Sequence, residues 1–271
     1  SSAASDVYKR QNMKRLIFAA FVLAALAAGS PAAVHAADNN PATSCPAAGA
    51  TELMQPADSL LAGSGSQWLP VFTAVEIAAP ADVLLVQVPD TEAPKIVYDT
   101  KGSTTTKFRA EVRDGVLRIS ERRDSRRAER TAVTVYYNTL QKLTVQEASV
   151  SFDAPFRATL FDLVLGSSAQ LKATLDVADL SLELTGSNTV ATLTGKARYM
   201  RVYASGGRVG AAELETMSAE ANATGSSRVV LQVTDRLEAK TSTGGVVTYK
   251  GNPAVVRTDE KFMGGSIAHE E

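Results

Sequence analysis

The chain has 271 residues, 45% of them apolar, so it is long enough for one large or two small globular domains and is not disordered throughout. It carries 28 basic and 29 acidic residues. The first 36 residues hold four of the basic side chains and one of the acidic ones, which leaves 24 basic and 28 acidic residues, a net charge of −4. A mildly acidic remainder gives no electrostatic reason to bind nucleic acid, so we expect no nucleic-acid partner.

Cysteine and histidine are scarce, which excludes several kinds of site. Cys45 is the one cysteine, and His35 and His269 are the two histidines. A single thiol cannot form an internal disulfide or supply a multi-cysteine metal site. The histidines lie far apart in the sequence, so we expect no histidine-based catalysis in the folded body. The sequence therefore predicts no catalytic, cofactor-binding or metal-binding residue, no cofactor and no enzyme activity.

The first 36 residues contain the three parts of a secretory signal peptide, in order. Met13-Lys14-Arg15 is basic, residues 16–28 form an uninterrupted apolar run, and Val34 and Ala36 fit the small-residue positions before a cleavage site. This run is too short to span a bilayer as a helix. We predict a non-native leader over 1–12 and a signal peptide over 13–36. Export to the periplasm or cell surface should follow, with no transmembrane span after cleavage.

Residues 37–66 have the composition of a linker. They are rich in Ala, Pro, Ser, Gly and Asn, and they end in Gly63-Ser64-Gly65-Ser66. Cys45 lies inside this segment, past the end of the apolar run, so we interpret it as an incidental free thiol and not as a lipidation site. The sequence predicts a flexible linker over 37–66 and a folded head domain over 67–268.

The sequence beyond Trp68 is typical of short strands separated by turn residues. Asp114-Gly115 stands between two such runs and predicts a hairpin, because this turn needs the positive φ that Gly tolerates. The β-rich runs are Val71–Ile77, Val83–Val88, Lys107–Val112, Val116–Ser120 and Thr131–Tyr137.

Past residue 145 a glycine-containing triplet recurs at a fixed spacing. The intervals between the first glycines of successive triplets are 20, 20, 19, 19 and 20 residues. The triplets are Gly166-Ser167-Ser168, Gly186-Ser187-Asn188, Gly206-Gly207-Arg208, Gly225-Ser226-Ser227, Gly244-Gly245-Val246 and Gly264-Gly265-Ser266. Such a period indicates a solenoid, and each glycine should lie in a turn with positive φ or a close approach to the next rung.

Alternation within each repeat distinguishes strands from helices. Counting back from a glycine by two, four and six residues reaches apolar or small side chains, and a step of two means a strand with one buried face. These are Leu184, Leu182 and Leu180, then Ala204, Val202 and Met200, then Ala223, Ala221 and Ala219; the pattern weakens before Gly244. We predict an all-β, right-handed parallel β-solenoid with rungs of about 20 residues. The strands from 68 to 145 should form a cap over its N-terminal end.

These features resemble the bacterial family called putative auto-transporter adhesin, head GIN domain. The resemblance rests on residues 72–77, the hairpin over 113–119, the repeated Gly-Ser turns and the closing segment Tyr249-Lys250-Gly251-Asn252-Pro253. It covers residues 68–268. The resemblance implies a β-solenoid at the cell envelope and no catalytic residues, and it leaves the ligand open.

Parallel β-helices include polysaccharide-cleaving enzymes, whose paired carboxylates lie about 5 to 9.5 Å apart. Asp153, Asp162, Asp176 and Asp179 follow their respective turns by different numbers of residues, so they should form no column. Asp176 and Asp235 share an offset of ten residues, but three rungs separate them. We therefore interpret these aspartates as solvated side chains.

Two further groups of side chains have both a binding and a structural interpretation. The segment Glu121–Arg130 holds five arginines and three acids. It could contact phosphates or acidic glycans, but a mixed-charge loop whose own acids pair locally is the interpretation we favour. Tyr136, Tyr137, Tyr199 and Tyr203 could stack on sugars, although packing is the usual role of strand tyrosines.

Two functional hypotheses remain. The first is an exported, non-enzymatic envelope or adhesion-type interaction module whose partner is a surface component, glycan or protein. The alternative is a glycan-binding or polysaccharide-active β-helix protein. Clustered acids or aromatics along one solenoid face would favour the alternative.

Overall fold

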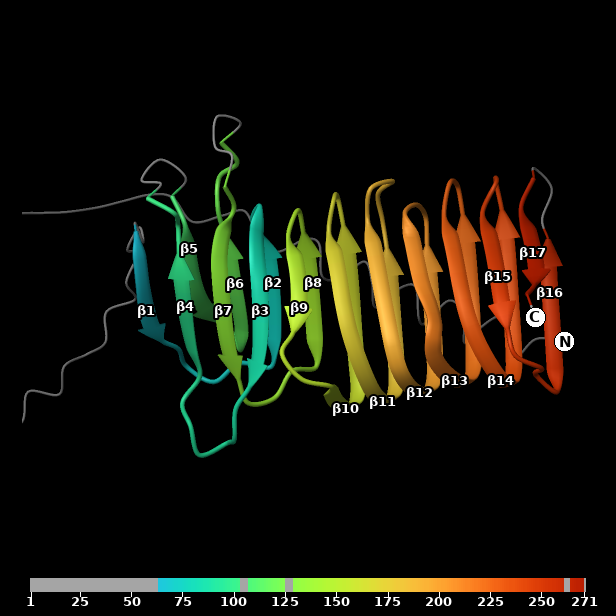
Figure 1. The fold of residues 1–271 in the computed structure, drawn as a ribbon, viewed down its shortest axis with the longest axis horizontal. Helices are drawn as coiled ribbons and strands as arrows, with labels where there is room; N and C mark the ends of the chain where they lie inside the picture. Colours follow the sequence, from blue (N-terminus) through green and yellow to red (C-terminus); the bar gives the residue numbers. More distant parts are fainter. Residues whose placement is uncertain (1–62, 103–106, 125–128, 261–263, 271) are drawn as a thin grey trace, which may run out of the picture. The chain divides into compact units, whose positions relative to one another are not determined.

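The computed structural model describes residues 63–102, 107–124, 129–260 and 264–270, which contain strands and no helix. The predicted leader, signal peptide and nearly all of the predicted linker lie outside these residues. Seventeen strands form one continuous curled sheet (Figure 1). They are β1 (Ser64–Trp68), β2 (Ala74–Ala78), β3 (Ala81–Gln87), β4 (Lys95–Asp99), β5 (Arg109–Arg113), β6 (Val116–Ser120), β7 (Thr131–Tyr137), β8 (Lys142–Gln146), β9 (Ser149–Phe152), β10 (Phe156–Gly166), β11 (Gln170–Leu184), β12 (Val190–Ala204), β13 (Arg208–Thr224), β14 (Arg228–Ser242), β15 (Val246–Lys250), β16 (Val255–Glu260) and β17 (Ser266–His269).

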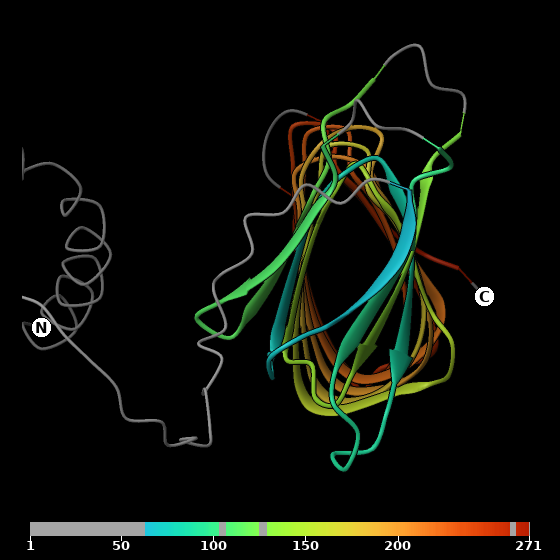
Figure 2. The ribbon, with the colours of Figure 1, turned by 90° about the vertical axis from the view of Figure 1, so that its left-hand side faces the viewer.

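The strands from β10 onward stack in parallel as the rungs of a solenoid. Leu180 of β11 pairs with Met200 of β12, Met200 pairs with Ala219 of β13, and the same position continues to Leu237 of β14. Viewed along the stack, successive rungs superimpose around one common interior (Figure 2). The predicted parallel β-solenoid is confirmed.

The interior is filled by the side chains that the alternation predicted. Leu184 lies beside Ala204, and Ala204 beside Ala223, and all three are fully buried. At the first of these contacts the large Leu184 side chain meets a small one in the next rung, which helps to keep the interior close-packed. Before Gly244 the column continues through Thr241, one residue further from its glycine than in the earlier rungs, so the pattern there only seemed to weaken.

The N-terminal strands do not all form a cap, contrary to the prediction for residues 68–145. Ala74 of β2 pairs in parallel with Val116 of β6 on one side and with Lys142 of β8 on the other. β3 is inserted in the same way between β7 and β9. β2 and β3 thus form a rung of the solenoid that lies between two rungs made by later parts of the chain (Figure 1).

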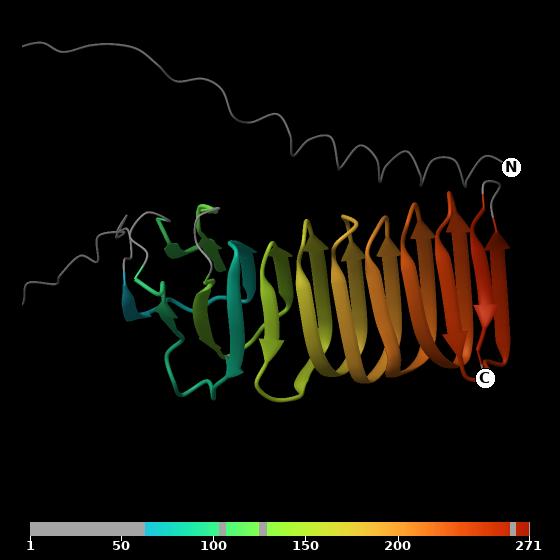
Figure 3. The same cartoon turned by 45° about the horizontal axis from the view of Figure 1, so that its top comes forward.

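Three strands pair antiparallel at the N-terminal end of the stack and cover it. β4 pairs antiparallel with β7, β1 with β4, and β5 with β6. Figure 3 shows the first strands, coloured blue to green, at one end of the stack. β1 begins at Ser64, inside the predicted linker. Gly65 lies opposite Tyr98 of β4, where a Cβ would clash with the Tyr98 side chain. The β5–β6 hairpin turns at Asp114 and Gly115, whose φ values are 53° and 73°, as the sequence predicted.

The rung-ending glycines mostly have the predicted role. Gly186 has a φ of +94°, and a Cβ built on it would lie 2.9 Å from the carbonyl oxygen of Ser167 in the preceding rung. Gly166 differs, because the positive φ of its turn, 57°, falls on Ser167. The spacing of the turns was therefore predicted correctly, but in two turns the left-handed residue, Ser167 or Gly207, follows the predicted glycine by one position.

The C-terminal end of the stack is finished by local hydrogen bonds. The Glu260 carboxylate of β16 accepts a hydrogen bond of 2.8 Å from the backbone N–H of Ile267. The His269 ring stacks on Tyr249 with centroids 4.9 Å apart, and its Nε2 lies 2.7 Å from the carbonyl oxygen of Gly251. These contacts give His269 a structural role.

Candidate functional site

Matching outward positions of β10–β14 stack into columns on one side of the solenoid. One column runs from Asp162 through Ser181, Arg201 and Glu220 to Glu238, with one residue from each strand. Parallel in-register pairing places neighbours in a column about 4.8 Å apart, the spacing of the strands. We call the outward side chains of the C-terminal halves of β10–β14 the ladder face.

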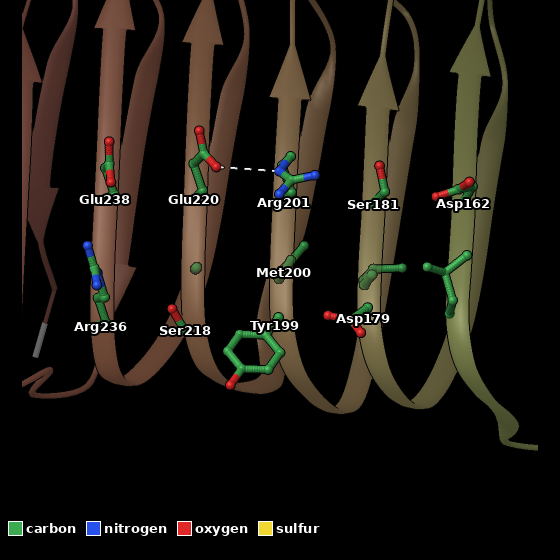
Figure 4. Close-up of a pocket in the computed structure, with 13 residues that line it drawn as sticks. Asp162, Asp179, Ser181, Tyr199, Met200, Arg201, Ser218, Glu220, Arg236 and Glu238 are labelled. Atoms are coloured by element: carbon green, nitrogen blue, oxygen red, sulfur yellow. Dashed lines mark hydrogen bonds and ion pairs between the residues drawn. The ribbon is translucent and has the colours of Figure 1, made fainter. Parts of the chain in front are cut away.

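The ladder face is hollowed. A depression of about 410 Å³ lies over the strands, and Figure 4 shows its lining side chains, which rise from five successive rungs. The polar and aromatic members are Asp162, Asp179, Ser181, Tyr199, Arg201, Ser218, Glu220, Arg236 and Glu238. Hydroxyl, carboxylate, guanidinium and aromatic groups are thus all within one surface patch.

Three outward side chains, two tyrosines and one arginine, follow one another on β12, the middle strand of this face. Tyr199, Arg201 and Tyr203 all point outward, because residues two apart in a strand share a face. The tyrosines are 50% and 51% exposed. Their Cα atoms lie about 13 Å apart, four residues at about 3.3 Å each. We call this set the Tyr–Arg–Tyr triplet.

The packing interpretation of the strand tyrosines holds for Tyr137, whereas Tyr136 is only partly buried. Tyr137 is 1% exposed, and its ring contacts Phe156 in the core. Tyr199 and Tyr203 are half exposed, so for them the packing interpretation is wrong. Their alternation with the buried Met200 and Val202 was available in the sequence and could have predicted their outward orientation.

Charged side chains on the outer surface pair between neighbouring rungs. Arg201 Nε lies 3.4 Å from Glu220 Oε2, the contact drawn in Figure 4. A second column places Arg157 Nε 3.5 Å from Asp176 Oδ2. Because all four side chains are largely in water, these pairs add little stability and can exchange their partners for a ligand.

Two acidic side chains are direct neighbours in the first column, a pair that sequence analysis missed. Glu220 and Glu238 are neighbours on β13 and β14, so their backbones are about 4.8 Å apart, close to the spacing of some glycosidase pairs. The Lys240 ammonium, 2.7 Å from Glu238, lowers the pKa of that carboxyl group. A general acid for glycoside hydrolysis needs the opposite shift.

The four aspartates at residues 153, 162, 176 and 179 do not form a column, as the sequence predicted. Asp176 stacks on Lys196, and Lys196 stacks on Glu215. The position in β14 that continues this column is Gln232, so the predicted shared position of Asp176 and Asp235 is wrong. The bulges in β13 shift the register and invalidate simple counting from the glycines.

The arginine-rich segment 121–130 is anchored by contacts outside itself. Arg130 Nη1 lies 3.2 Å from Asp82 of β3, and its Nη2 donates a 2.6 Å hydrogen bond to the carbonyl oxygen of Glu147. Glu121 is buried and accepts a hydrogen bond of 2.8 Å from the Thr131 hydroxyl. Arg130 therefore pairs with a neighbouring strand, which the local-pairing interpretation did not foresee. Residues 125–128 lie outside the described residues.

The described residues contain neither a metal-binding cluster nor a membrane-spanning helix. In that part of the chain no three His, Cys, Asp or Glu side chains are grouped so as to hold a metal ion. It also contains no helix long and apolar enough to cross a membrane. Cys45 and His35 lie outside the described residues.

A family model called putative auto-transporter adhesin, head GIN domain, matches residues 71–253. The chain belongs to this family. No curated protein matches it. Among solved structures, a putative adhesin from Bacteroides fragilis has a TM-score of 0.69 at 17% identity, over 80% of this chain and 100% of that one.

Two further structures of Parabacteroides distasonis proteins are similar to this GIN-domain chain. One, a putative lipid binding protein, has a TM-score of 0.55 at 17% identity over 77% of this chain and 97% of its own. The other, a putative adhesin, has a TM-score of 0.54 at 19% identity over 76% and 96%. At these identities the likeness establishes the fold alone.

Proposed function

We propose that this GIN-domain chain is an exported, non-enzymatic adhesion-type module that binds a component of the cell envelope or cell surface through the ladder face. The observation that carries the proposal is the Tyr–Arg–Tyr triplet, whose two rings are half exposed on the middle strand of that face. Tyrosine and arginine are the residue types, with tryptophan, that most often dominate binding energy. The family and the predicted signal peptide support a role at the envelope.

The rigidity of the face also supports a binding role. Tyr199, Arg201 and Tyr203 belong to a strand that is hydrogen-bonded on both sides, between β11 and β13. Binding to side chains on such a strand requires little ordering of the backbone, which lowers the entropic cost of association. The weak, solvated pair between Arg201 and Glu220 leaves the guanidinium available to a ligand.

The same residues also support a second candidate function, the binding of a glycan. An exposed tyrosine ring can cover the apolar C–H face of a sugar, while hydroxyl, carboxylate and guanidinium groups bond its hydroxyls. The hollow of about 410 Å³ brings these groups together. A protein surface would use the triplet differently, by burying both rings against apolar side chains.

Catalysis on a glycan is not part of the proposal. The Lys240 ammonium lowers the pKa of Glu238, so this carboxyl is not prepared to act as a general acid. We expect no release of reducing ends from polysaccharides. Repurified protein that releases them, and loses this activity on Glu238→Gln, would contradict the non-enzymatic assignment.

A glycan array combined with capture of solubilised bacterial envelope tests the binding face. Replacing both tyrosines, Tyr199→Ala with Tyr203→Ala, should reduce binding at least about tenfold, because hot-spot side chains contribute about 2 kcal/mol or more each. The matched control is Lys172→Ala with Thr192→Ala. These two exposed neighbours lie in the N-terminal halves of β11 and β12, outside the ladder face. Equal binding by both double variants would show that the ladder face is not the site.

Export is tested separately. When the chain is expressed in a bacterium, the protein recovered outside the cytoplasm should begin at Ala37, after removal of the signal peptide. A mature protein that still contains Met13 would contradict the proposed processing.

A further inference from the structure

A tryptophan, a lysine and a tyrosine lie in one row across the N-terminal strands. Trp68 of β1 is directly opposite Lys95 of β4, and Lys95 is directly opposite Tyr136 of β7. Directly opposed residues share a face of the sheet, so the three side chains are neighbours. Lys95 Nζ lies 5.6 Å from the centroid of the Trp68 ring and 4.4 Å from that of Tyr136.

The row is exposed to solvent at Trp68 and is bordered by the segment between β3 and β4. Trp68 is 67% exposed, an unusual state for so large an apolar ring. Val88, Glu92 and Ala93, from the segment between β3 and β4, complete a depression of about 410 Å³ around the three side chains. An exposed aromatic ring beside a formed hollow is the arrangement of a ligand site.

The wall of this hollow is held in place by hydrogen bonds. Asn138 Nδ2 donates to the carbonyl oxygens of Pro89 and Glu92, at 2.7 and 2.9 Å. The backbone N–H of Leu69 donates to the carbonyl oxygen of Pro94 at 2.9 Å. The segment between β3 and β4 is therefore tied to β7 and to the residue that follows Trp68, so the hollow is formed before any ligand arrives.

Lys95 differs from other basic residues of the N-terminal strands. Lys101 and Arg118 each lie within 3.3 Å of a carboxylate oxygen. Within the described residues Lys95 has no ion pair, although Glu92 lines the same hollow. Its ammonium is positioned by two aromatic faces, an attraction that leaves its N–H groups free to bind an anion.

We propose that Trp68, Lys95 and Tyr136 bind a sugar that carries a carboxylate. The indole ring can cover the apolar face of a pyranose, the ammonium can bind the carboxylate, and the remaining sugar hydroxyls stay in water at the open side. A fatty acyl chain would need an enclosed apolar cavity instead. The site shares no residue with the ladder face and does not depend on the proposed function.

The chain contains a single tryptophan, so its fluorescence reports on this site alone. Titration with an oligogalacturonide or with sialyllactose, two sources of a sugar carboxylate, should give a saturable change in emission. Lactose, the neutral control, should bind at least about tenfold more weakly, because a hydrogen bond to a charged group contributes about 1.5 to 3 kcal/mol.

Variants decide whether Lys95 carries the selectivity. Lys95→Met should remove the preference for acidic sugars, whereas Lys142→Met, at an exposed lysine of β8, should retain it. If Lys95→Met fails to fold, raising the salt to about 1 M, where the Debye length is about 3 Å, should abolish the preference in the unaltered protein. The emission change should persist in the Tyr199→Ala, Tyr203→Ala variant, which separates this site from the ladder face.

Three results would overturn the proposal. They are no saturable emission change with either acidic sugar, equal affinity for lactose, and full retention of the preference in folded Lys95→Met. A response to only one of the two acidic sugars would support the site and identify the source of its carboxylate.

Discussion

Replacing Gly186 by valine should destabilise the solenoid at a point between two regular rungs. The backbone of Gly186 has a φ of +94°, a conformation that side chains rarely adopt. A non-glycine residue there costs on the order of 1–3 kcal/mol, and a β-branched one lies at the upper end of that range. The substitution therefore introduces conformational strain before any contact is counted.

Contacts with the preceding rung add to this strain. A Cβ on Gly186 would lie 2.9 Å from the carbonyl oxygen and 3.2 Å from the nitrogen of Ser167, which are backbone atoms. The same oxygen accepts a 3.1 Å hydrogen bond from the Thr189 hydroxyl, so moving it disturbs the turn. Together we expect a loss of about 2–4 kcal/mol in the free energy of unfolding.

Thermal melts followed by circular dichroism measure this loss. For a domain of this size 1 kcal/mol shifts Tm by about 2–4 °C, so Gly186→Val should lower Tm by about 4–16 °C. The whole β signal should shift together, because each rung is stabilised by its neighbours. Ser187→Val is the control: Ser187 is exposed and has no positive φ, so its change should stay within about 0.5 kcal/mol. A Gly186→Val variant that melts with the unmodified protein would refute the role of the turn.

Two further predictions concern a strand glycine and a buried tyrosine. Gly195 of β12 has a φ of +107°, and a Cβ there would overlap the carbonyl oxygen of Leu175, so Gly195→Ala should lower Tm at least as much as Gly186→Val. Gly210→Ala should not, because Gly210 has no positive φ and a Cβ there would meet the Ala191 carbonyl oxygen at 3.7 Å, an ordinary contact distance. Burial raises the pKa of Tyr137 above its ordinary value of about 10, so the unfolded chain loses this proton first. The associated stability is present below about pH 10 and is lost as pH rises toward the folded pKa, and Tyr137→Phe should melt with a smaller alkaline decrease than the unmodified protein. An equal decrease in both proteins at about pH 11 would exclude Tyr137 as its source.

The repetitive part of the fold was predictable because its information is local. The glycine spacing and the two-residue alternation around Leu182 and Val202 both follow from contacts between residues one rung apart. The order of the first rungs was not predictable in this way. No local feature of β2 indicates that it lies between β6 and β8, because that placement depends on pairings with segments much later in the chain.

The two candidate sites differ in the same way, since one follows from local sequence and the other from long-range strand pairing. The outward orientation of Tyr199 and Tyr203 follows from alternation within one strand and was missed only because packing was favoured. The row of Trp68, Lys95 and Tyr136 joins three strands, one of them antiparallel to its neighbours, and has no signature in the spacing of the sequence. Predicting such a row requires knowledge of which residues are opposite one another in paired strands, and only the structure shows this.

The position of β2 and β3 has a consequence for the order in which the chain can fold. From β11 to β14 each strand pairs with the one made just before it, so these rungs can be added one after another. β2 and β3 cannot pair with β6 and β7 until more than forty further residues are available, and their second neighbours, β8 and β9, come later still. A chain made from its N-terminus therefore holds the apolar strands Ala74–Ala78 and Ala81–Gln87 unpaired while the next segments are synthesised. β2 and β3 are therefore synthesised early but are fully paired late. In a chain that ends before β8, one edge of each of these strands has no hydrogen-bonding neighbour.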